Sequence, residues 1–144
     1  PSVLGAISGA VAGLVAITPA AGFVLPGSAL LIGLVSGAVC FWAATSLKHM
    51  LGYDDSLDAF GVHGVAGIAG ALLTGALADP AINSLGEGAS VVKQITGIGA
   101  TVVWSAVATF VILMICKFTV GIRVSEEGEA DGLDATLHGE ALHE

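Results

Sequence analysis

The stretch Asp58-Ala-Phe-Gly-Val-His63-Gly-Val-Ala-Gly-Ile-Ala-Gly70 decides the fold of this chain. It places His63 in a run, Ala59 to Ala78, that contains no other ionisable side chain. Such a run can cross a bilayer as a helix, because ~20 residues span ~30 Å of hydrocarbon. An ionisable side chain at that depth is costly to insert, so His63 is a candidate functional residue.

The residues that share a helical face with His63 are all small. By i, i+3 and i+4 spacing they are Ala59, Ala66, Gly67, Gly70 and Thr74. A face of this kind has two interpretations, and the spacing leaves both open. It can bring another helix close, with the histidine hydrogen-bonded to that partner. It can also leave a narrow conduit with His63 on its wall.

The composition is that of an integral membrane protein. Of the 144 residues 55% are hydrophobic and 11% are charged, whereas about 25% of the residues in a soluble domain are charged. Mean hydropathy is +0.93. The apolar segments are long and rich in Ala, Gly and Leu, unlike the ~10-residue alternating strands of membrane barrels. We therefore expect an all-α membrane protein, and the start at Pro1 suggests the C-terminal part of something longer.

The hydropathy pattern predicts a bundle of four transmembrane helices in residues 1–120 and an acidic tail in 121–144. The expected spans are about 1–18, 27–48, 56–78 and 90–118. Pro19 and Pro80 are expected to end the first and third spans, because a residue before proline is driven out of the helical region.

Glycines repeat every four residues in the first two spans. They are Gly5, Gly9 and Gly13 in the first, and Gly33 and Gly37 in the second. Small residues at this spacing let helices approach closely in membranes, so we expect both sets to form close helix contacts.

Acidic residues gather where the third span begins. Asp54 and Asp55 are expected to cap the free N–H groups of that helix and to complement its dipole. Asp58 is expected to lie about three residues inside the helix. There it would combine capping with an acidic mouth that attracts a cation.

Several classes of function are disfavoured. The net charge is −8, and seven of the twelve acids lie after residue 125, so the acidity belongs to a tail and argues against nucleic-acid binding. There is no phosphate-binding glycine loop, no H-E-x-x-H and no nucleophile elbow, so we expect no enzyme and no catalytic residue. Only one of the four histidines lies in a span, so neither a metal site nor a cofactor is expected.

Basic residues set the expected orientation. Lys48 and His49 share one end of the bundle with Lys117 and Arg123, and Lys93 lies at the other end. The positive-inside rule then puts the 48–57 loop and the tail in the cytoplasm of a multi-pass protein of the cell membrane.

The residues around His63 also carry a family resemblance. Asp54 to Gly64, followed by Gly67 and by Gly70 to Gly75, resembles the tenth transmembrane helix of the ammonium transporter family (Amt/MEP/Rh). Residues 1–19, 27–48 and 90–117 resemble the eighth, ninth and eleventh helices, and 121–140 resembles the cytoplasmic tail. The resemblance implies the last four helices of an eleven-helix fold.

The resemblance implies transport of ammonium, with His63 as one pore histidine of a hydrophobic conduit that passes deprotonated ammonia. It places Ser8 and Val11 near the conduit wall and makes Asp58 and Ala59 part of the pathway. The chemistry suits this role, because a bare cation crosses hydrocarbon at prohibitive cost and an imidazole titrates near neutral pH. The second pore histidine and the phenylalanine gate of the family belong to helices that this chain does not contain.

The tail resembles the family's regulatory segment at Gly132-Leu133-Asp134 and at His138-Gly139-Glu140. The resemblance implies a homotrimer and docking of a PII-type signal protein at the cytoplasmic face. The plain alternative is an acidic, solubilising tail with no fixed partner. For the whole chain, the alternative function is a non-transporting membrane sensor or truncated pseudo-transporter that signals through this tail. A conduit for another small neutral molecule is a weaker variant.

Overall fold

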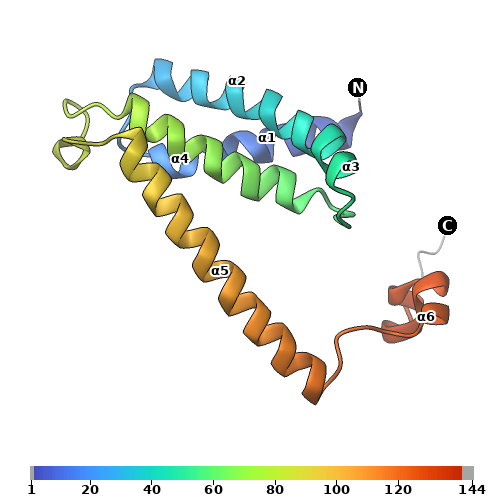
Figure 1. Ribbon diagram of the computed structural model, residues 1–144. Helices are drawn as coiled ribbons and strands as arrows, with labels where there is room; N and C mark the ends of the chain where they lie inside the picture. The colour runs from blue at the N-terminus through green and yellow to red at the C-terminus, as the bar shows by residue number, and fades with distance from the viewer. Residues whose placement is uncertain (1, 141–144) are drawn as a thin grey trace. The chain divides into compact units, whose positions relative to one another are not determined.

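The computed structural model describes residues 2–140, and its regular structure within them is helical (Figure 1). The helices are α1 (Val3–Ile17), α2 (Pro26–Trp42), α3 (Lys48–Leu51), α4 (Ala66–Leu77), α5 (Val91–Thr119) and α6 (Glu126–Asp131). Tight or wide helical turns extend three of them: a 3₁₀ turn Thr18–Ala20 after α1, a π turn Ala43–Leu47 between α2 and α3, and a π turn Phe60–Val65 before α4.

Four continuous helices are long and apolar enough to cross a membrane. They are Val3–Ala20, Pro26–Leu51, Phe60–Leu77 and Val91–Thr119. The prediction of an all-α membrane fold with four spans is therefore confirmed.

The chain forms two compact units, one up to Thr101 and one from Val102 onward. The first unit holds α1 to α4 and the start of α5, and the second holds the rest of α5 and α6. The division expected at residue 120 separates membrane from tail by composition, and it stays a prediction.

The core of the first unit lies where α1, α2 and α4 pack through residues spaced by four. On each helix these residues are buried: Ala12, Ala16 and Ala20 from α1 and its extension, Ile32, Ser36 and Cys40 from α2, and Ala66, Gly70 and Thr74 from α4. Rows of this spacing form the ridges that interlock most often between helices. Their small size brings the backbones close: a Cβ added at Gly70 would lie 2.0 Å from the carbonyl oxygen of Ala16.

The expected glycine contacts do not form among residues 2–140. A Cβ added at Gly9, Gly13, Gly33 or Gly37 would meet no atom within 4 Å of the described chain, and one at Gly5 would meet only Ser2. On α1 the contact is made instead by the alanine row at 12, 16 and 20. Contacts of the glycine rows outside residues 2–140 stay a prediction, because spacing shows that a face is smooth and not which face has a partner.

The third span begins later than expected. The π turn begins at Phe60, and Asp58 lies before it with φ +54°. That left-handed conformation cannot continue a right-handed helix, so the prediction that Asp58 lies inside the helix is wrong. Asp55 caps the helix as expected, since its carboxylate accepts hydrogen bonds from the N–H groups of Ala59 and Phe60, both at 2.8 Å.

Candidate functional site

His63 lies in the π turn that leads into α4. A π turn contains one more residue than an α turn, so residues before Ala66 are rotated about the helix axis relative to those after it. The predicted small face is divided as a result. Ala66, Gly70 and Thr74 are buried against the other helices, whereas Ala59 and His63 are exposed.

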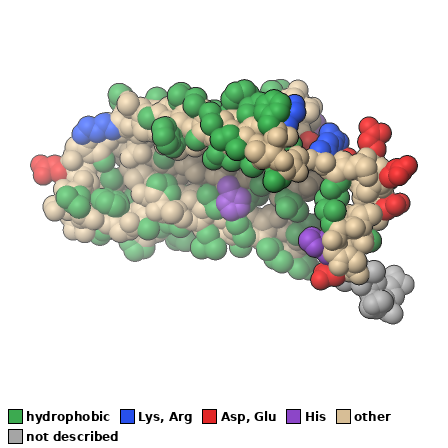
Figure 2. All heavy atoms as spheres, turned by 90° about the horizontal axis from the view of Figure 1, so that it is seen from below, with side chains coloured by type: hydrophobic (Ala, Val, Ile, Leu, Met, Phe, Trp, Pro, Cys, Tyr) green, Lys and Arg blue, Asp and Glu red, His purple; other side chains and the backbone are tan. Residues whose placement is uncertain are grey.

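The imidazole of His63 is uncovered. Its neighbours in sequence, Val62 and Gly61, are buried, so the turn itself is held firmly in the packed unit. Within the described part of the chain no side chain forms a hydrogen bond or ion pair with this imidazole. In Figure 2 a histidine side chain lies open on the visible face among hydrophobic and uncharged groups. A firmly held turn with an exposed imidazole can act on a molecule or a helix placed against it.

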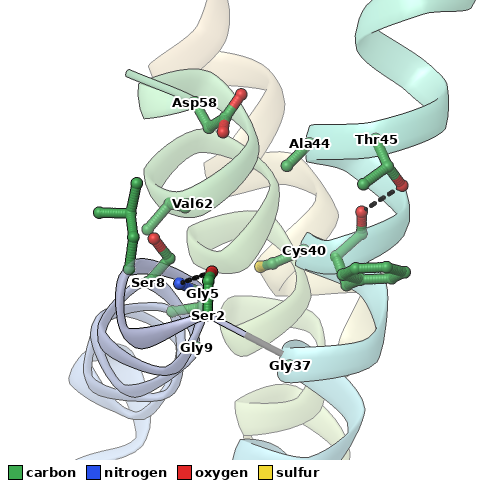
Figure 3. Close-up of a pocket in the computed structure, with 13 residues that line it drawn as sticks. Ser2, Gly5, Ser8, Gly9, Gly37, Cys40, Ala44, Thr45, Asp58 and Val62 are labelled. Atoms are coloured by element: carbon green, nitrogen blue, oxygen red, sulfur yellow. Dashed lines mark hydrogen bonds between the residues drawn. The ribbon is translucent and has the colours of Figure 1, made fainter. Parts of the chain in front are cut away.

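A cavity of about 270 Å³ opens near the beginning of the same helix (Figure 3). Side chains from three helices converge on it: Ser8 from α1, Cys40 from α2 and Val62 from the π turn. Asp58 and Thr45 also line it. The structure therefore brings Ser8 and Asp58 of the predicted pathway together, whereas His63, Ala59 and Val11 are not among its lining residues.

The carboxylate of Asp58 is paired with a lysine. Lys48 Nζ lies 2.8 Å from Asp58 Oδ1 and also donates a hydrogen bond to the carbonyl oxygen of Asp55. The expected acidic mouth is therefore partly neutralised. In the sequence, Lys48 stands out only as one of the basic residues that set the expected orientation. The sequence signal for its role is that Lys48 ends the expected second span and precedes Asp55 and Asp58 by one short loop.

The tail residues of the second unit form two helical segments, Glu126–Asp131 and Asp134–His138. Ser125 caps α6 by accepting a hydrogen bond from the Gly128 N–H, and Thr136 Oγ1 donates to the carbonyl oxygen of Gly132 at 2.6 Å. Arg123 forms two hydrogen bonds with Glu129, at 2.7 and 2.9 Å. This bidentate pair lowers the pKa of the Glu129 carboxyl below its usual value.

The predicted regulatory residues form a second helical turn after α6. Asp134 and His138 begin and end a π turn, Leu133 precedes it, and Gly132 and Gly139 flank it with positive φ values. All five residues are exposed, so the turn presents them outward. His143 lies outside the described residues.

In the part of the chain that the structure describes, no group of three or more His, Cys, Asp or Glu side chains could hold a metal ion. The site thus consists of one imidazole on an apolar helix and a mostly apolar cavity, to which Ser8 and Thr45 contribute hydroxyls and Asp58 a carboxylate paired with Lys48. The class of protein that this fold and site define is a multi-pass helical membrane protein.

Comparison with known proteins narrows the class to a family. The sequence model of the Ammonium Transporter Family matches residues 1–142. The chain is 49% identical over 151 residues to an ammonium transporter of Bacillus subtilis, covering 100% of this chain and 37% of that protein. It is 49% identical over 148 residues to one of Aquifex aeolicus, covering 99% of this chain and 35% of that protein. The crystal structure of Saccharomyces cerevisiae Mep2 matches with a TM-score of 0.73 and 37% identity, over 83% of this chain and 30% of that one.

The chain belongs to the ammonium transporter family. That is a family of transporters and not of enzymes. The chain spans about a third of the length of the curated relatives it matches, 37% and 35% of the first two.

Proposed function

We propose that the protein carries ammonium across a cell membrane as neutral ammonia, and that His63 lies on the wall of the conduit. The observation that carries this proposal is the exposed imidazole beside the buried Gly61 and Val62 in the π turn of an apolar span. The names of the relatives support ammonium as the substrate.

Moving an ion from water into hydrocarbon is costly. Ammonium is a strongly hydrated cation, and hydrocarbon offers it no compensating hydrogen bonds. Neutral ammonia avoids that cost, and it forms when ammonium gives its proton to water at the mouth of the conduit. An imidazole can hold ammonia at this point, because either ring nitrogen can donate or accept a hydrogen bond near neutral pH.

The other pathway residues take positions around this step. Ser8 and Asp58 share the cavity near the start of α4, and we assign that cavity to the cytoplasmic opening. Ala59 and Val11 contribute wall surface. We propose that this chain supplies one side of the conduit, as the last four helices and tail of a larger transporter.

The tail is assigned to the cytoplasm, where it couples the subunits of a homotrimer and meets a PII-type signal protein. Its ordered turn supports this, since Leu133, Asp134 and His138 are presented outward on a hydrogen-bonded scaffold.

A second candidate is a non-transporting membrane sensor that signals through the tail. The observation in its favour is that the tail forms its own folded segment with a bidentate ion pair. In that case removing the residues after Gly121 abolishes signalling, whereas replacing His63 leaves it unchanged.

The deciding experiment measures ammonium flux into proteoliposomes that contain the purified protein with His63→Ala. We expect flux to fall at least tenfold, the effect of about 1.4 kcal/mol on the rate-limiting barrier. His49→Ala is the matched control, because His49 is also exposed but lies at the end of the second span. Full flux in His63→Ala contradicts transport through this site.

A further inference from the structure

Lys48 holds both ends of the loop that joins the second and third spans. Its carbonyl oxygen accepts a hydrogen bond from the Gly52 N–H at 2.9 Å, where φ of +64° ends α3. Its ammonium reaches across the loop to the carbonyl oxygen of Asp55 and to the carboxylate of Asp58. The backbone of Lys48 therefore closes the first turn of the loop, and the side chain of Lys48 closes the last turn.

The two aspartates that Lys48 contacts are those that start the next helix. The carboxylate of Asp55 accepts hydrogen bonds from the N–H groups of Ala59 and Phe60. Asp58 accepts the N–H of Val62 on its carbonyl oxygen at 2.9 Å, and it does so from a left-handed backbone conformation. Such a conformation is uncommon for a residue with a side chain and persists where surrounding contacts hold it. The bond from Lys48 is a contact of that kind.

The same helix start sets the direction of the imidazole. His63 follows Val62 directly in the π turn. On the packed side of this turn, a Cβ added at Gly61 would lie 3.2 Å from the backbone nitrogen of Ala44, in the π turn that precedes Lys48. Backbone contact thus holds one side of the turn and Lys48 holds its beginning.

We propose that Lys48 is a positioning residue for His63, which fixes the rotation of the π turn through Asp58 and so the direction of the imidazole toward its substrate. The inference rests on the proposed function of His63. Lys48 does not touch the substrate; it acts through the helix start.

The competing explanation is an ion pair that only stabilises the surface. The side chains of Lys48 and Asp58 are 24% and 41% exposed, and isolated exposed pairs contribute little to stability. A role in positioning predicts something that a surface pair does not: the effect of removing Lys48 must depend on the presence of His63.

The test is a double-mutant cycle on ammonium flux in proteoliposomes, with Lys48→Met and His63→Ala singly and together. We expect Lys48→Met to lower flux about tenfold when His63 is present and by less than about twofold when it is absent, because coupled residues are not additive. Lys48→Arg is expected to restore most of the flux, since a guanidinium keeps the charge and the reach. Lys93→Met is the matched control: Lys93 also donates to a loop carbonyl, that of Gly88, at 2.6 Å.

Each result separates the two proposals. If Lys48→Met lowers flux by the same factor with and without His63, positioning is overturned, whereas the loss in His63→Ala alone still supports the proposed function. If His63→Ala keeps full flux, the proposed function fails and positioning fails with it.

A milder variant guards against loss of folding in Lys48→Met. Asp58→Asn removes the ion pair but keeps a residue that tolerates the left-handed conformation. We expect it to lower flux in the same His63-dependent way. Failure of Asp58→Asn to accumulate in the membrane, where Lys93→Met does accumulate, would overturn positioning by showing that the pair is needed for folding.

Discussion

Two faces of α1 consist of small residues spaced by four, and within residues 2–140 only one of them packs closely against another helix. On the other face, Gly5 and Gly9 line the cavity near the beginning of α4, and a Cβ added at Gly9 or Gly13 would meet no described atom within 4 Å. The neighbouring row of Ala12, Ala16 and Ala20 is buried against α2 and α4. The two faces are nearly alike in sequence, so side-chain size alone does not decide which is used. A contact also needs a partner of matching shape on the other helix.

The partner of the buried row shows what that match requires. Ala16 meets α4 at Gly70, where there is no room for a methyl group. Two closely packed backbones make many weak dispersion contacts, and all of these contacts are lost when the helices separate. Substitution of glycines across both kinds of face tests the comparison directly.

Gly70→Ala is expected to have the largest effect. The new Cβ would lie 2.0 Å from the carbonyl oxygen of Ala16 and 2.9 Å from its Cα, and backbone atoms cannot turn aside. The two helices must separate, at a cost of about 3 kcal/mol or more in the free energy of unfolding. Thermal unfolding of the purified protein in detergent measures this.

Gly67→Ala is the control for that variant, because it lies in the same helix and its Cβ would meet nothing within 4 Å of the described chain. Equal stability of the two variants would mean that α1 and α4 do not cross at Gly70.

Gly61→Ala is expected to have a smaller effect. Its Cβ would lie 3.2 Å from the nitrogen and 3.4 Å from the Cα of Ala44, so a shift of a few tenths of an ångström relieves the contact. The gain of up to ~1 kcal/mol in helix propensity offsets part of this strain, which leaves a net loss below ~1 kcal/mol. Chemical denaturation resolves a difference of this size. A loss as large as that of Gly70→Ala would show that the two π turns are as rigidly packed as the helix crossing.

Gly9→Ala is expected to have the smallest effect, with the opposite sign. No described atom lies near the new Cβ, so the variant gains helix propensity, up to ~1 kcal/mol, without a clash. Thermal unfolding and the oligomeric state in detergent are the two measurements. Destabilisation, or a change of oligomeric state, would show that another part of the protein or a second copy covers this face.

Much of the fold was predictable from the sequence. The four spans followed from apolar length, and Asp55 was recognised as a cap from its place before the third span. These features depend on a residue and its near neighbours, so a local pattern is sufficient. The family was predictable because the motif around His63 combines an acidic start, an intramembrane histidine and regularly spaced glycines.

The rest depended on contacts between segments. The π turn and the left-handed Asp58 arise where two helices meet and a lysine crosses a loop, and neither has a mark in the local sequence. For the same reason, the local pattern predicts Asp58 inside the helix and does not predict the ion pair between Lys48 and Asp58.

The sequence by itself determined that this chain has four apolar segments long enough to cross a membrane, because the transfer of each side chain from water into lipid adds up along the chain. It also determined that His63 is the one ionisable side chain of the apolar run Ala59 to Ala78. Only the tertiary structure decided which small-residue face is a contact and which way the imidazole faces. Those properties depend on the shape of a neighbouring helix, and a stretch of sequence carries no information about its neighbour until the two are packed together.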